Sequence, residues 1–230
     1  MSKPISDIRL YTSRVPNADG HSLPGEFGST ALHIRLRRIA MKLREQDFTL
    51  GDFDHLYVNL TPCLPEGEIR LSQRSVLRET AWLRYVDAGV SRTFLSDADD
   101  DALTSMAARC LMLFAQDESA RQMILTAISE AAKGEEMLMY FKAKQSGGIR
   151  AVIYLRLLDS GMYHPLLFVY DAKGRERLRT DLPPSMELHA LGEINVSRKA
   201  VTIRPRKNAY ASTLQPLVFP LPENERASHT

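Results

Sequence analysis

The sequence predicts an α+β protein in which an antiparallel sheet, ending in a C-terminal β-meander, has about three helices packed mainly on one face. Two observations support this class. Apolar residues recur at helical spacing in residues 31–46, 97–114 and 117–133. Beyond residue 135 the pattern changes to short alternating runs separated by glycine turns, which are typical of antiparallel hairpins. Helical and strand patterns in separate parts of a chain indicate an α+β arrangement.

Each predicted helix has a recognisable start. Ser29 supplies an N-cap for the first helix, and Leu32 and Leu36 begin its apolar stripe. The other two helices open with acidic residues, Asp97 and Asp117, which suit the positive end of a helix dipole.

Strand patterns occur in both halves of the chain. Residues 54–60 alternate polar and apolar side chains and stop at a proline, which predicts a half-buried strand. The other predicted strands are residues 8–12, 68–71, 82–90, 137–144, 149–158, 163–171, 175–179, 188–196 and 200–204. Residues 1–30 are otherwise predicted to be an irregular arm. We treat residues 1–220 as one domain, with a change of pattern near residue 135 that could separate two subdomains, and residues 221–230 as a disordered tail.

The composition is that of an ordinary globular protein. The chain has 230 residues, 44% of them hydrophobic, and its net charge of +2 argues against a nucleic-acid coat. Cys63 and Cys110 are too few for a disulfide framework and predict free thiols in a reducing compartment. Neither a signal peptide nor an apolar run of membrane-spanning length is visible, so a cytoplasmic protein is expected.

No motif predicts catalysis, a metal site or a cofactor. The acidic run from Asp97 to Asp101 resembles a calcium loop, but alanines occupy the positions that need glycine and glutamate. We therefore interpret it as favourable charge at a helix start. An alternative enzyme centre would combine His55 with Asp54 or Asp87, since a neighbouring carboxylate can orient an imidazole as a base. A surface histidine on a strand is the commoner outcome.

Charge is distributed unevenly, which suggests candidate partner-binding residues. Residues 97–136 carry nine acids against three bases, and residues 173–207 carry nine bases against four acids. Oppositely charged regions can steer a charged partner. The acidic candidates are Asp97, Asp99, Asp100 and Asp101. The basic candidates fall at period two and would share one face of a strand, either as a docking ladder or as the solvated face of an edge strand: Lys173, Arg175, Arg177 and Arg179.

A third candidate site combines aromatic and cationic side chains. Trp82, Arg84 and Tyr85 belong to residue types that are enriched at interface hot spots. The alternative is that Trp82 and Tyr85 are core residues of a strand.

The segments DHLYVNLTP (residues 54–62) and WLRYVDAGV (residues 82–90) resemble a family of bacterial immunity proteins that accompany polymorphic toxins. The similarity covers roughly residues 30–115. It implies an intracellular non-enzyme that neutralises a cognate toxin by protein–protein binding, and it implies no particular contact residues. A nuclease toxin would present a basic cleft to residues 97–136, whereas an acidic toxin surface would favour the basic ladder. The alternatives are the dispersed enzyme centre and a nucleic-acid-associated protein that uses residues 173–207.

Overall fold

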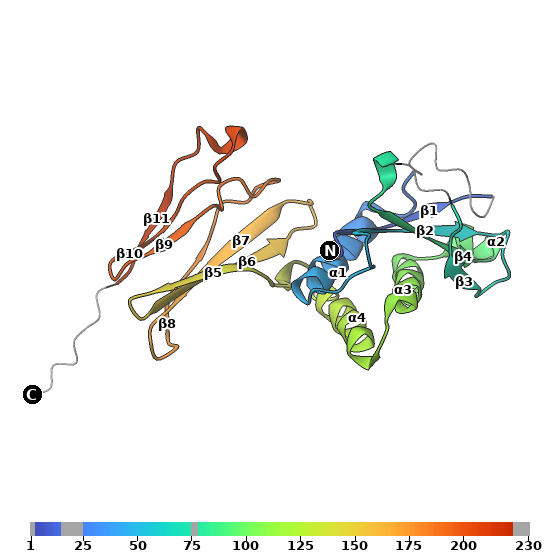
Figure 1. Ribbon diagram of the computed structural model, residues 1–230, viewed down its shortest axis with the longest axis horizontal. Helices are drawn as coiled ribbons and strands as arrows, with labels where there is room; N and C mark the ends of the chain where they lie inside the picture. The colour runs from blue at the N-terminus through green and yellow to red at the C-terminus, as the bar shows by residue number, and fades with distance from the viewer. Residues whose placement is uncertain (1–2, 15–24, 75–77, 223–230) are drawn as a thin grey trace, which may run out of the picture. The chain divides into compact units, whose positions relative to one another are not determined.

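The computed structural model describes residues 3–14, 25–74 and 78–222, which group into two compact units. The first unit is Met1–Met137 and the second is Leu138–Thr230 (Figure 1). The predicted domain of residues 1–220 is therefore divided. The division falls next to residue 135, where helical periodicity gives way to strand alternation, because each unit buries its own apolar residues.

The first unit is a mixed sheet covered by helices. In chain order it contains β1 (Asp7–Thr12), α1 (Thr30–Glu45), β2 (His55–Thr61), β3 (Ile69–Leu71), β4 (Leu83–Gly89), α2 (Arg92–Asp97), α3 (Asp100–Leu111) and α4 (Glu118–Ala131). The sheet order is β1-β2-β4-β3; β1, β2 and β4 run parallel, and β3 is antiparallel to β4. Figure 1 shows α1, α3 and α4 on one side of this sheet. The α+β class is confirmed, whereas the parallel strands were not foreseen.

Side-chain caps explain where the helices begin. Ser29 Oγ accepts a hydrogen bond from the Leu32 amide at 3.0 Å, as predicted for α1. Asp117 Oδ1 caps α4 in the same way at 2.7 Å. The helix predicted at residues 97–114 begins later than expected, because Asp97 ends the preceding helix α2 and Asp99 caps α3.

The parallel strands are buried on both faces. Alternation sends Leu10, Val58 and Val86 to one face and Tyr11 and Tyr85 to the other, and all five are at most 3% exposed. α1 packs against β1, and α3 packs against β3 and β4. β2 is consequently buried at every residue after its first, rather than half-buried, because covered parallel sheets leave no wet face.

The second unit consists of two antiparallel sheets. The first is the meander β5 (Met139–Ser146), β6 (Ile149–Leu157), β7 (Tyr163–Tyr170) and β8 (Glu176–Asp181), and the second contains β9 (Ile194–Val196), β10 (Ala200–Ile203) and β11 (Leu217–Pro220). The meander confirms the C-terminal antiparallel sheet. β9 lies against β5 and β6, which buries Ala151, Ile153 and Leu155.

The chain end departs from the prediction of a tail from residue 221. β11, which sequence analysis missed, pairs with β10. Leu221 is buried and its amide donates to the Lys199 carbonyl at 2.7 Å, so it belongs to the fold. Residues 223–230, like residues 15–24 of the predicted irregular arm, lie outside the described residues.

Candidate protein-interaction surface

The acidic candidates mostly stabilise the first unit. Asp99 Oδ1 caps α3 by accepting a backbone N–H at 2.8 Å. Asp100 Oδ2 accepts from Ser29 Oγ at 2.7 Å, and Asp101 forms an ion pair with an arginine of α1. Asp97 is exposed at the end of α2. These contacts support the helix-start interpretation, and the described residues contain no group of three His, Cys, Asp or Glu side chains that could hold a metal ion.

The three candidates around β4 do not form one surface. Trp82 precedes the strand and is 42% exposed. The Arg84 guanidinium lies 4.8 Å from the centroid of the Phe53 ring. Tyr85 is 2% exposed and, by strand alternation, points to the opposite face from Arg84. Tyr85 is therefore a core residue, while Trp82 remains accessible.

Tyr85 belongs to a buried tyrosine cluster that sequence analysis missed. Tyr57 and Tyr85 stack with ring centroids 5.8 Å apart, and Tyr11 meets both edge-on at 6.3 and 6.4 Å. The Arg74 guanidinium lies 4.6 Å from the Tyr85 centroid and hydrogen-bonds Tyr11. Burial raises the pKa of Tyr11 to about 12, although Arg74 acts in the opposite direction. The cluster closes the sheet face opposite the helices.

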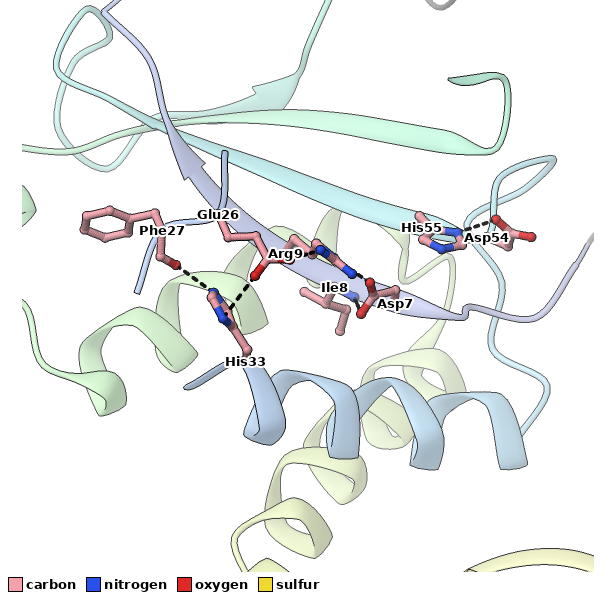
Figure 2. Close-up of polar contacts among 8 residues, drawn as sticks. All are labelled: Asp7, Ile8, Arg9, Glu26, Phe27, His33, Asp54 and His55. Carbon is pink, nitrogen blue, oxygen red and sulfur yellow. Dashed lines mark hydrogen bonds and ion pairs between the residues drawn. The ribbon is translucent and has the colours of Figure 1, made fainter. Parts of the chain in front are cut away.

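Of the two pairs considered for an alternative enzyme centre, His55 with Asp54 is formed and His55 with Asp87 is not. In the β2–β4 register His55 stands opposite Leu83, whereas Asp87 stands opposite Asn59, four residues and about 13 Å further along the strands. Asn59 Nδ2 donates to Asp87 Oδ1 at 2.8 Å, and the Asp87 side chain has no exposed surface. His55 Nδ1 instead lies 2.6 Å from Asp54 Oδ1 (Figure 2). Asp87 is therefore too far from His55 to orient its imidazole, whereas Asp54 is in hydrogen-bond contact with it.

A further polar group lies between β1 and the start of α1 (Figure 2). Arg9 Nε donates to Asp7 Oδ2 at 2.7 Å, and Arg9 also forms an ion pair with Glu26. His33 places Nδ1 3.2 Å from Glu26 Oε2 and Nε2 3.3 Å from the Phe27 carbonyl. The pocket that they line is only about 180 Å³. These contacts join the residue 26–27 segment to β1 and to the start of α1.

The basic ladder is broken, so the prediction that its four residues share one strand face is wrong. Lys173 and Arg175 lie in the turn before β8, and Arg175 forms an ion pair with Asp171 at 2.7 Å. Hydrogen bonds, above all from the Arg175 backbone amide, lower the pKa of Asp171. Arg177 lies at a register shift and donates to the Pro222 carbonyl. β8 is an edge strand, as the alternative interpretation stated.

Arg179 belongs to a different surface, which we call the aromatic face. Its rings come from three strands of the meander: Tyr140 contacts Tyr154 at 6.2 Å, Tyr154 contacts Phe168 at 5.6 Å, and Phe168 stacks with Tyr170 at 6.1 Å. The Arg179 guanidinium lies 5.2 Å from the Phe168 centroid. Tyr140 is 42% exposed, Tyr154 and Tyr170 are half-buried, and Phe168, next to Arg179, is buried. The face therefore presents ring surface together with a cation.

The two ends of the aromatic face differ in charge. At one end Arg156 forms an ion pair with Asp181 and lies 3.1 Å from His164 Nδ1. At the other end Arg150 is exposed and pairs in register with Tyr170. Within the described residues neither Arg150 nor Arg179 forms an ion pair. The face consequently carries two cations that form no ion pair with the described residues, and Glu176 stands opposite Tyr170 in the register.

The two cysteines are free and occupy different environments. Cys63 is exposed in the loop after β2, and its thiol donates to the Arg14 carbonyl. Cys110 is buried in α3, and burial raises the pKa of its thiol to about 12. The thiolate is the reactive form, so the environment of Cys110 suppresses its reactivity.

Comparisons with known proteins give no relatives. No protein-family model, no curated protein and no solved structure matches the chain. None of the helices within residues 3–14, 25–74 and 78–222 has the length and apolar character of a membrane span. The functional argument therefore rests on the residues themselves.

Proposed function

We propose that this chain is a non-catalytic binding protein that contacts a protein partner through the aromatic face of its second unit. The observation that carries the proposal is the unbroken row of four rings with Arg179 packed on it. Tyrosine and arginine dominate interface hot spots, and tyrosine supplies a large contact area at a small entropic cost. An accessible group of apolar rings with cations at its edge is typical of interaction sites.

The charge of the face indicates what kind of surface the partner presents. Among the described residues Arg150 and Arg179 form no ion pair, whereas the acids at 99–101 are engaged in helix caps and contacts with α1. An acidic partner surface would therefore complement the aromatic face and speed the encounter. The resemblance of residues 30–115 to immunity proteins supplies the partner class, a cognate bacterial toxin.

A matched pair of exposed aromatic residues tests this assignment. Tyr140 in the second unit and Trp82 in the first are both 42% exposed. The probe is the C-terminal domain of a toxin encoded beside this gene, and its affinity for the full chain is measured by biolayer interferometry. Tyr140→Ala combined with Arg150→Glu should weaken binding roughly tenfold or more, because truncated hot spots cost at least about 1.4 kcal/mol. Trp82→Ala should change the affinity less than about twofold.

Other results would redirect the assignment. Equal affinity of the wild type and the double variant would reject the aromatic face, and a loss confined to Trp82→Ala would move the interface to the first unit. Arginine beside stacked rings is also used to bind single strands. A complex with oligothymidylate whose affinity falls steeply with salt would favour the nucleic-acid alternative.

A further inference from the structure

The second unit contains a pocket that is separate from the aromatic face. Its volume is about 600 Å³, within the range of small-molecule sites. It lies beside β10, where the chain leaves the strand. Its lining combines apolar side chains with cations, chiefly Pro205, Ala211, Leu214, Arg204, Arg206 and Lys207.

Hydrogen bonds fix the framework of this pocket. Lys142 Nζ donates to the Leu191 carbonyl at 3.1 Å and to the carbonyl of Gly192, which is one of the lining residues. A Cβ atom at Gly192 would collide with the carbonyl oxygens of Arg204 and Pro205, so the two segments are in close backbone contact. The pocket wall is thus built by packing within the second unit.

The lining of the pocket has more cations than acids. The Asn195 side-chain amide is oriented so that its oxygen accepts from Arg204 Nε at 3.3 Å. Its nitrogen then donates to Glu193 Oε1 at 3.2 Å. Over the described part of the chain, Arg204, Arg206 and Lys207 form no ion pair. Glu193 is the single acid among the lining residues, so the lining carries a net charge of +2.

We infer that this pocket binds a small organic anion, with a carboxylate or phosphate group held by Arg206 and Lys207 and an apolar body lying against Ala211 and Leu214. Guanidinium and ammonium groups bind such anions through charge-assisted hydrogen bonds. The apolar wall excludes water from the remainder of the ligand and gives it a hydrophobic contribution. The inference does not depend on the aromatic face or on a protein partner.

Two fluorescent probes that differ by one charge test the inference on the full chain. 8-Anilino-1-naphthalenesulfonate carries an anionic group, whereas N-phenyl-1-naphthylamine has the same rings without it. Arg206→Gln with Lys207→Gln should weaken binding of the sulfonate roughly five- to twentyfold, at about two- to fivefold for each exposed charge. The neutral probe should bind both proteins equally. Lys173→Gln with Arg198→Gln, which removes two exposed charges elsewhere in the second unit, should leave the sulfonate affinity unchanged.

Competition then identifies the anionic group. Phenyl phosphate or benzoate should displace the sulfonate from the wild type, and the stronger competitor shows whether a phosphate or a carboxylate is preferred. Displacement by neither compound would overturn the inference. An equal loss of sulfonate affinity in the control double variant, or an equal loss for the neutral probe in the pocket variant, would overturn it as well.

Discussion

The hydroxyl of Tyr11 should make the first unit sensitive to alkaline pH. Tyr11 is 3% exposed within the tyrosine cluster, and burial raises its pKa from 10.0 to about 12. In the unfolded chain the same phenol loses its proton near pH 10. The unfolded state therefore binds fewer protons than the folded state between pH 10 and 12, and stability falls as the pH rises through this range.

The size of the effect follows from the pKa difference. One pKa unit corresponds to 1.36 kcal/mol, so a shift of about two units places an upper limit of roughly 2.7 kcal/mol on the contribution. This contribution is fully present below pH 10. At pH 11.5 linkage removes about 2 kcal/mol of it, whereas at pH 9 the loss is about 0.1 kcal/mol or less.

Urea unfolding at pH 9 and pH 11.5 measures the effect. Tyr11→Phe should lower stability at pH 9 by about 1 kcal/mol, since its hydrogen bond with Arg74 is lost. Between the two pH values the wild type should lose about 2 kcal/mol more than this variant. Tyr210→Phe, at an 80% exposed position, is the matched control and should follow the wild type. Equal pH dependence in the wild type and Tyr11→Phe would refute the assigned burial of this phenol.

Two further predictions concern the end of β4 and the cysteines. Gly89→Ala should destabilise the first unit by about 2–4 kcal/mol, because the new Cβ would overlap the Pro65 carbonyl oxygen, whereas Gly25→Ala meets no atom within 4 Å and should be neutral in urea unfolding. In the native protein only Cys63 should react rapidly with Ellman's reagent, and Cys110 should react only on unfolding. Rapid reaction of a native Cys63→Ser variant would show that Cys110 is accessible and would contradict the prediction.

Features with local causes were predictable from the sequence. The caps at Ser29 and Asp117 set helix starts through hydrogen bonds within one turn, and glycine turns set the meander. Strand direction was not predictable, because alternation reports which face a side chain occupies and not which strand it pairs with. The parallel pairing of β1, β2 and β4 depends on contacts between distant segments. β11 was missed because its four residues, which end at Pro220, are too few to show an alternating pattern; the strand is recognised only by its pairing with β10.

The aromatic face shows how far register can be derived from a turn. A two-residue turn at residues 147–148 pairs Ser146 with Ile149, and counting back from it places Phe141 opposite Tyr154. A bulge shifts the pairing by one, so Tyr140 takes that position. The aromatic residues could be identified from the sequence. Which rings contact each other depends on the bulge in β5, and the sequence pattern does not predict that bulge. Arg179 was selected for its period-two spacing, whereas its structural role is its contact with Phe168.

One combination of residues has opposite consequences in the two units. Arg74 over Tyr85 and Arg179 over Phe168 are both arginine–aromatic pairs, at 4.6 and 5.2 Å. Arg74 is 7% exposed and its pair closes a core, while Arg179 is exposed at a sheet edge. Hot-spot composition alone therefore does not distinguish a buried group such as Tyr85 from an exposed one such as Arg179. Burial makes the difference, because Arg74 and Tyr85 have both used their contacts in folding, whereas the exposed Arg179 can still gain from being covered by a partner.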